Sequence, residues 1–288
     1  MQDLFIPKMT LIGTGLIGGS LSLALKQAGA VGDVTGVGRG LDNLKTALAL
    51  GVIDRYSQQA EAAVADADLV FLATPVRSLP TMAARILPHM KPGAVLTDGG
   101  SVKEHIVHAI EPLLPAGIHF VAGHPIAGTE KSGAAAAFAG LYQDRRCILT
   151  PTVNTDAQAL DLVRRMWQTV GSEVVIMDVV KHDRILAAIS HLPHMVAYAL
   201  VNAVADNDRY DENLLDYSAG GFRDFTRIAS SDPDMWRDIA LTNREALLEM
   251  LRGFESMLAA LRADIDAGNG DRIFDFFSRS KKRRDALL

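Results

Sequence analysis

His124 is the residue in this sequence that is best placed to carry acid–base chemistry. It follows the apolar segment HFVAG at 119–123, which has the composition of a buried strand. Because imidazole titrates near neutral pH, a histidine at a strand end can take the proton of a hydroxyl group on a bound ligand. The position alone leaves a structural histidine as an equal alternative.

A pair of histidines lies in the later, mostly apolar half of the chain. His191 and His194 are three residues apart in the segment SHLPH, so they share one face of a helix. No further ligands follow at the spacing of a metal site, and we therefore predict no bound metal. Two buried structural histidines are the alternative, and Pro193 between them can kink the helix toward a cleft.

Two arginines, Arg223 and Arg227, follow a glycine-rich break at 218–222. Guanidinium groups bind carboxylates through paired hydrogen bonds, so both are candidate ligands for an acidic substrate. Pairing with a nearby acid such as Asp224 is the alternative. Trp236 is also a candidate substrate contact, although an aromatic residue in this position is more often part of a core.

A glycine-rich turn near the N-terminus predicts a dinucleotide-binding site. The apolar run MTLI at 9–12 leads into Gly13-Thr14-Gly15-Leu16-Ile17-Gly18, and a helical pattern follows. In such a turn the first glycine permits a tight bend and the second lets the backbone approach a pyrophosphate. The third allows the helix to pack closely on the strand, and the helix N-terminus then faces the anion.

Residues at the ends of two strands are expected to contact the cofactor. After the second strand the sequence reads VGRG, where a carboxylate would favour NAD by binding the ribose hydroxyl. Arg39 can instead accept the 2′-phosphate of NADP, so the sequence favours NADP and leaves NAD open, with a loop arginine facing solvent as the alternative. Thr74, Pro75 and Val76 follow a later strand at its carboxyl end, where α/β sheets bind ligands.

Alternating strands and helices must position these residues. Apolar runs predict five strands, at 9–12, 34–37, 69–73, 95–97 and 120–122, with helices at 18–27, 43–50 and 79–87 between them. This alternation indicates a Rossmann-like, doubly wound α/β sheet that is covered on both faces. Two further runs, 147–149 and 173–177, flank a helical stretch at 157–170 and are expected to extend the same sheet.

From residue 178 onward the pattern is helical. The run 185–205 is apolar nearly all round, which requires burial from every side. A long helix is expected from Asp232-Pro233, and its apolar residues between 247 and 265 repeat as a heptad seam. We therefore divide the chain into a Rossmann-like domain, 1–177, and an all-helical domain, 178–288, which binds substrate and forms a homodimer.

Composition excludes several classes of protein. The formal net charge of −5 argues against a nucleic-acid-binding protein. The single cysteine, Cys147, cannot form an intrachain disulfide and lies in an apolar segment, as expected of a buried residue in a reducing cytoplasm. We identify no signal peptide and no apolar run long enough to span a membrane, so a cytoplasmic protein is expected.

Several segments resemble the prephenate and arogenate (cyclohexadienyl) dehydrogenases of tyrosine biosynthesis. In chain order they are GTGLIGGSL, ATPV, DGGSVK, HPIAGTEKSG, SHLPH and GGFRDFTRIASSDPDMWRD. HPIAGTEKSG and FRDFTRIA are specific to that family, whereas the glycine turn occurs in many dehydrogenases. The resemblance implies a Rossmann-like domain followed by an all-helical dimerisation domain, in agreement with the organisation above.

The resemblance also implies roles for individual residues. His124 resembles the catalytic histidine that takes the proton of the ring 4-hydroxyl group, and Ser101 resembles the serine that orients this histidine. Arg227 resembles the arginine that binds the substrate side-chain carboxylate. His194 resembles the histidine near the ring carboxylate that leaves as carbon dioxide.

Thr129 and Glu130 resemble a pair of residues that lines and gates the substrate pocket. Arg39 stands where many family members have an aspartate, which leaves strict NAD use open. The implied reaction oxidises prephenate, arogenate or both, with hydride transfer to NAD or NADP and loss of carbon dioxide. Another two-domain Rossmann dehydrogenase, of the β-hydroxyacid dehydrogenase or imine reductase type, and a non-catalytic NADP(H) sensor remain alternatives.

Overall fold

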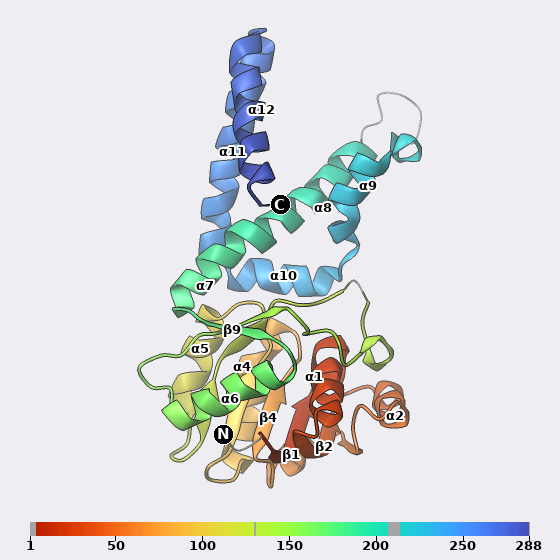
Figure 1. Ribbon diagram of the computed structural model, residues 1–288, viewed down its shortest axis with the longest axis vertical. Coiled ribbons are helices and arrows are strands. Elements are labelled where there is room, and N and C mark those ends of the chain that lie inside the picture. Colours follow the sequence, from red (N-terminus) through yellow and green to blue (C-terminus); the bar gives the residue numbers. More distant parts are fainter. Residues whose placement is uncertain (1–3, 130, 207–213, 288) are drawn as a thin grey trace.

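The computed structural model describes residues 4–129, 131–206 and 214–287, so Glu130 lies outside the described residues. The chain forms an α/β part around a six-stranded sheet and a helical part that stands above one edge of it (Figure 1). The predicted fold class, a Rossmann-like doubly wound sheet followed by a helical domain, is confirmed.

The main sheet is parallel throughout and has the strand order β3-β2-β1-β4-β5-β6. Its strands are Ile6–Ile12 (β1), Val31–Val37 (β2), Arg55–Ser57 (β3), Leu69–Leu72 (β4), Val95–Asp98 (β5) and His119–Val121 (β6). β3 was not predicted, because its three residues are partly exposed and carry no apolar pattern. The strand order reverses between β1 and β4, and open α/β sheets bind ligands at the carboxyl ends beside such a reversal.

Helices cover both faces of this sheet, so it separates two apolar cores. One face packs against α1 (Leu16–Gln27), α2 (Leu41–Ala49) and α6 (Ala157–Thr169), and the other against α3 (Ala60–Val64), α4 (Leu79–Ile86) and α5 (Glu104–Ile110). Strand β4 shows the alternation, since Leu69 and Phe71 enter the first core while Val70 and Leu72 enter the second.

A second, three-stranded sheet corrects one sequence-based prediction. Gly123–Pro125 (β7), Arg146–Leu149 (β8) and Glu173–Ile176 (β9) pair with one another and do not extend the main sheet. The chain turns away after β6, where the Thr150 amide donates to the Ala122 carbonyl at 3.0 Å, and β7 then pairs antiparallel with β8. Apolar composition predicted β8 and β9 but not β7, and it does not specify which sheet a strand joins. Cys147 of β8 is buried, as predicted.

The helical part begins directly after β9. Its helices are α7 (Val179–Leu186), a π-helical turn (Ala187–His191), α8 (Leu192–Ala205), α9 (Gly220–Thr226), α10 (Pro233–Thr242), α11 (Arg244–Asp266) and α12 (Gly270–Asp285). Asp232 caps α10 as predicted, since its carboxylate accepts hydrogen bonds from the amides of Asp234 and Met235. The predicted long helix is wrong in extent, because it breaks at Asn243, whose side chain is bonded to the α7 region.

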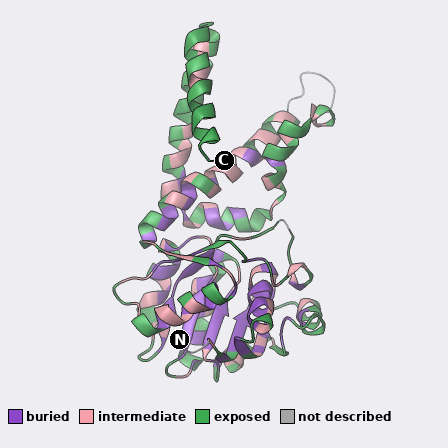
Figure 2. Cartoon of the chain, in the orientation of Figure 1, coloured by how far each residue is buried: buried purple, intermediate pink, exposed green. Residues whose placement is uncertain are grey.

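The helix over Val179–Ala205 corrects a second prediction. The π-helical turn joins α7 and α8 into one continuous helix, although Pro193 lies at the start of α8. By length and composition alone this helix could cross a membrane, whereas the sequence analysis identified no run of that length. In the single chain only Ala197 of α8 is buried, so the predicted burial of this apolar helix on all sides is not met within one chain. Figure 2 shows the contrast between the buried sheet and the largely exposed helices.

A fully buried ion pair lies at the carboxyl end of β5. Lys103 Nζ contacts the Asp98 carboxylate, and both side chains have 0% exposure. Lys103 Nζ also donates to the Gly123 carbonyl at 2.7 Å, while Asp98 Oδ1 accepts the Gly123 amide at 3.2 Å. The pair therefore holds both backbone polar groups of the residue that precedes His124.

We predict that Lys103→Met lowers the free energy of unfolding by about 3–5 kcal/mol, because it leaves the Asp98 charge buried and unpaired. Lys91→Met is the matched control, since Lys91 pairs with Asp68 at a partly exposed site and its loss costs under about 1 kcal/mol. Denaturant unfolding measures both values. Equal effects of the two substitutions would contradict the prediction.

Candidate active site

His124 lies in the middle of β7, opposite Ile148 of β8. Its side chain is 8% exposed, and burial is the main cause that lowers its pKa well below 6.5, with smaller contributions from His182 and Lys103. The ring is therefore neutral at physiological pH. A neutral imidazole has one free lone pair, which is the property a proton acceptor needs.

His124 is hydrogen-bonded to a second buried histidine from the helical part. Its Nδ1 lies 2.9 Å from Nε2 of His182, and the two rings meet edge to face with centroids 5.1 Å apart. His182 Nδ1 in turn lies 2.7 Å from Asp183 Oδ1. Burial lowers the pKa of His182, although the bond to Asp183 opposes this shift.

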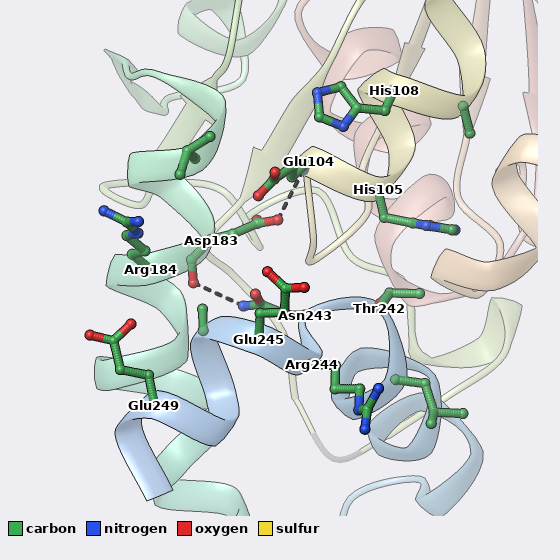
Figure 3. A pocket seen from close by; sticks show the side chains of 14 residues that line it. Glu104, His105, His108, Asp183, Arg184, Thr242, Asn243, Arg244, Glu245 and Glu249 are labelled. Atoms are coloured by element: carbon green, nitrogen blue, oxygen red, sulfur yellow. Dashed lines mark hydrogen bonds between the residues drawn. The ribbon is translucent and has the colours of Figure 1, made fainter. Parts of the chain in front are cut away.

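Asp183 is the centre of a hydrogen-bond network between the two parts of the chain. Its carboxylate accepts the backbone amides of Lys103 at 2.8 Å and Glu104 at 2.9 Å, at the start of α5. Its carbonyl accepts the Asn243 side-chain amide at 2.8 Å, and Asn243 Nδ2 also lies 3.0 Å from His191 Nδ1. Figure 3 shows Asp183 with its bonds to Glu104 and Asn243 at the side of an open pocket of about 670 Å³.

Of the predicted substrate-binding residues, His194 and Trp236 lie against each other. The His194 ring stacks on the Trp236 indole with centroids 3.6 Å apart, and the His191 ring meets it edge to face at 6.0 Å. The positive charge of Arg227 lies close enough to help lower the pKa of His194, after the larger effect of burial. The buried indole Nε1 has no hydrogen-bond partner within the described part of the chain. Arg223 lies on α9, exposed and bonded to Ser218.

The glycine turn has room for a dinucleotide on one side only. Gly13 has φ +101°, and a Cβ there would lie 2.4 Å from the Ala73 carbonyl oxygen, while a Cβ at Gly18 would lie 2.4 Å from the Gly13 carbonyl oxygen. At Gly15 a Cβ would meet nothing within 4 Å, and α1 starts there without a side-chain cap. The open approach to an uncapped helix N-terminus fits a bound pyrophosphate.

The remaining turn residues are tied to neighbouring segments. Thr14 Oγ1 accepts the Asn43 side-chain amide at 2.8 Å, and Asn43 Oδ1 accepts the amide of Ala134 at 2.9 Å. Leu16 is buried, and the Ile17 carbonyl accepts the Tyr142 hydroxyl at 2.5 Å. The glycine turn is thereby joined to the segment that follows β7.

The other candidate residues lie along the same edge of the sheet. Arg39 is exposed after β2, and Thr74, Pro75 and the buried Val76 follow β4. Ser101 is half-buried in the turn after β5, two residues before Lys103. Thr129 is exposed after β7, and its hydroxyl accepts the Lys131 amide at 3.2 Å. Among the described residues, no cluster of three or more His, Cys, Asp or Glu side chains could hold a metal ion.

Three residues of this network escaped the sequence analysis, namely His182, Asp183 and Asn243. The signal for the first two is a histidine–aspartate dipeptide just before an apolar helical run, where an unpaired buried charge would be costly. Asn243 carries no comparable signal, because its role arises from the helix break that brings it to Asp183.

Comparison with known proteins is consistent along the chain. Residues 21–176 match the family described as prephenate dehydrogenase, nucleotide-binding domain, and residues 178–279 match prephenate dehydrogenase, dimerization domain. The cyclohexadienyl dehydrogenase of Zymomonas mobilis is 39% identical over 280 residues, which is 97% of this chain and 95% of that protein.

Two solved structures are similar over nearly the whole chain. The prephenate dehydrogenase of Aquifex aeolicus, in complex with hydroxyphenyl propionate and NAD+, has a TM-score of 0.93 and 36% identity and covers 100% of both chains. The arogenate dehydrogenase of Synechocystis has a TM-score of 0.81 and 30% identity, covering 98% of this chain and 100% of that one.

We predict that the buried histidines make the protein acid-sensitive, with His191 as the test. Burial is the main cause that lowers the pKa of His191 to about 4. The Asp183 carboxylate raises this pKa, and His182 and His194 lower it further. In the unfolded chain this histidine takes up a proton near pH 6.5. The free energy of unfolding is therefore unaffected by His191 above that pH and decreases as the pH falls from 6.5 toward 4. The loss attributable to His191 is about 2 kcal/mol at pH 5.

Unfolding free energies at pH 7.5 and pH 5, for wild type and His191→Asn, measure this effect. The variant is expected to lose about 2 kcal/mol less than wild type between the two pH values. The same pH dependence in both proteins would mean that His191 is not held neutral in the folded state.

Proposed function

The chain belongs to the prephenate dehydrogenase family, and we propose that it oxidises and decarboxylates prephenate, arogenate or both. The single observation that carries this proposal is the buried, neutral His124 on β7, with Arg227, His194 and Trp236 on the helical part. This combination suits a ring hydroxyl and two carboxylates on one substrate.

The glycine turn and the strand ends after β2 and β4 are the residues that hold NAD or NADP in this proposal. Gly15 and the start of α1 receive the pyrophosphate, and Thr74, Pro75 and Val76 line the nicotinamide half. The bound nicotinamide supplies the hydride acceptor for the hydroxyl-bearing ring carbon. The role of the protein is to hold donor and acceptor in place and to handle one proton.

His124 accepts the proton of the ring hydroxyl, and Ser101 orients the hydroxyl group and the imidazole. Arg227 binds the side-chain carboxylate, because a guanidinium group forms paired hydrogen bonds with it. His194 faces the ring carboxylate that leaves as carbon dioxide, together with the indole N–H of Trp236, which has no hydrogen-bond partner among the described residues. Thr129 and Glu130 stay candidate residues of the substrate pocket, and Glu130 lies outside the described residues.

We predict that turnover is detected when prephenate and arogenate are each assayed with NAD and NADP, and that His124→Asn reduces it by about 10²–10⁴-fold. The asparagine keeps a polar side chain but cannot take the proton. Cofactor binding, followed by titration, is expected to remain unchanged.

His108→Asn is the matched control, because this histidine is exposed on α5. No turnover with any of the four combinations would refute the proposed function. A His124→Asn variant with more than half of wild-type turnover would refute the assignment of His124 as the base.

The cofactor preference is proposed to lie with NADP, accepted at least as well as NAD. Residues 38–40, directly after β2, include no carboxylate to repel a 2′-phosphate, and the Arg39 guanidinium is exposed in that loop. The Arg39 carbonyl accepts the Gln58 side-chain amide at 2.7 Å, which fixes the loop backbone while leaving the guanidinium group to a ligand.

We predict that Arg39→Ala shifts the ratio of kcat/KM values for NADP and NAD toward NAD by about tenfold, because one charge-assisted contact to the phosphate is lost. Steady-state kinetics with both cofactors measure the ratio. A tenfold preference of the wild type for NAD, or an unchanged ratio in the variant, would make Arg39 a bystander.

We also propose that the chain divides into two domains between residues 177 and 178 and that it forms a homodimer. A cytoplasmic location is proposed because it suits the single buried cysteine. The helical part exposes a series of large apolar side chains, which single-chain proteins seldom gather in one region. They include Ile189, Met257, Leu258, Ile265, Phe274 and Phe277. A second copy of the helical part, packed against α8, α11 and α12, would cover them.

We predict a dimer at micromolar concentration and its dissociation by Phe274→Asp, which places a charge at a 70% exposed apolar position. Sedimentation velocity measures the mass. Val153→Asp is the control, because Val153 is also an exposed apolar residue but lies in the α/β part. A wild-type monomer, or a dimeric Phe274→Asp variant, would contradict this interface.

A further inference from the structure

The hydrogen bonds around Asp183 fix where the protons of the two buried histidines lie. The carboxylate receives the backbone N–H groups of Lys103 and Glu104, which can only donate. An ionised carboxylate can only accept, so the third bond, to His182 Nδ1, requires a proton on that nitrogen. His182 therefore donates to Asp183 through Nδ1.

The same reasoning extends one residue further to His124. A neutral His182 that carries its proton on Nδ1 presents a lone pair on Nε2. His124 Nδ1 lies 2.9 Å from this lone pair, so it must donate, and the single proton of a neutral His124 is on Nδ1. His124 Nε2 is then left with a lone pair, on the side of the ring away from His182.

We propose that His182 and Asp183 are positioning residues, which hold the catalytic His124 in the Nδ1–H tautomer and leave its Nε2 free to accept the substrate proton. The proposal rests on the proposed function, in which His124 is the base. It adds that the helical part, and not the α/β part that carries His124, determines which nitrogen is the base.

The local fold explains how the two parts meet at this point. Strand β8 pairs with both β7 and β9, so the end of β9 lies near His124. Asp178 then caps α7, its side chain accepting the Lys181 amide at 2.9 Å, which places His182 in the first turn of the helix. The chain of hydrogen bonds from His124 to Asp183 is complete only when α7 is docked against β7 and α5.

The proton transfer is balanced within the site. The substrate O–H bond breaks as hydride leaves the ring carbon, and a new N–H bond forms at His124 Nε2. His124 is then an imidazolium, whose positive charge is stabilised through His182 by the Asp183 carboxylate. After carbon dioxide has left, the aromatic oxygen takes the proton back, so the reaction neither releases nor consumes a proton overall.

Two substitutions of His182 separate positioning from packing. In His182→Gln the side-chain carbonyl reaches the place of Nε2 and still accepts from His124 Nδ1. In His182→Asn the shorter amide reaches the place of Nδ1 and still donates to Asp183, but His124 loses its partner. Both variants keep a neutral polar side chain at the domain contact, and His108→Asn again serves as the exposed control.

The proposal expects kcat to fall by about 100-fold or more in His182→Asn and by less than about tenfold in His182→Gln, with KM within about threefold in both. Cofactor titration and thermal melts check that each variant is folded. Equal losses in the two variants, or a His182→Asn variant with wild-type kcat, would overturn the proposal.

The tautomer can be measured without any activity. Nitrogen-15 NMR of histidine-labelled wild-type protein is expected to show His124 protonated on Nδ1 between pH 7 and 8, with the signal assigned by its loss in His124→Asn. A proton on Nε2 would overturn the proposal directly. Absence of turnover together with an Nδ1 proton would refute the proposed function and leave the tautomer assignment standing.

Discussion

The buried ion pair between Asp98 and Lys103 is the interaction on which the geometry of the site depends. Lys103 uses its Nζ to hold Asp98 and the Gly123 carbonyl, and its backbone amide to hold Asp183. One residue thus fixes the backbone in front of His124 and the carboxylate behind His182. Two buried charges are costly to desolvate, and the cost is offset here because the two groups are bonded to each other, Asp98 accepts the backbone amides of Gly100 and Gly123, and Lys103 donates to the Gly123 carbonyl.

In the proposed mechanism, the electrostatics of the site keep His124, the proposed base, neutral. A carboxylate placed directly on His124 would raise its pKa and favour the protonated ring, which cannot accept a proton. His182 separates the two groups, so that burial and the nearby Lys103 charge lower the pKa of His124 while Asp183 still fixes the orientation through a neutral ring. The same separation leaves the negative charge close enough to stabilise the imidazolium during the reaction.

The sequence was most informative where a local pattern has one structural meaning. The glycine turn, the alternation of strands and helices and the Asp232 cap were predicted because each depends on neighbouring residues. The second sheet, the break at Asn243 and the pairing of His124 with His182 depend on residues far apart in the chain, and no spacing encodes them. His124 was selected from its predicted place at the end of a strand, although it lies within β7. Its partner was not identified, because a histidine–aspartate dipeptide has many ordinary explanations.

The helix over Val179–Ala205 connects the site to the exposed apolar surface. Pro193 removes a backbone donor, and the π-helical turn before it absorbs the loss, so α7 and α8 continue as one rod. The first turns of this helix carry His182 and Asp183, which are buried, whereas most apolar residues of α8 are only partly buried in the single chain. The high mean hydropathy of this helix therefore has two explanations. Its first turns pack against the α/β part, and α8 presents an apolar face that a second copy of the chain would cover. In a dimer built on α8, the α/β part would hold this helix at the end that carries His182 and Asp183, and the partner chain would hold it at the other end.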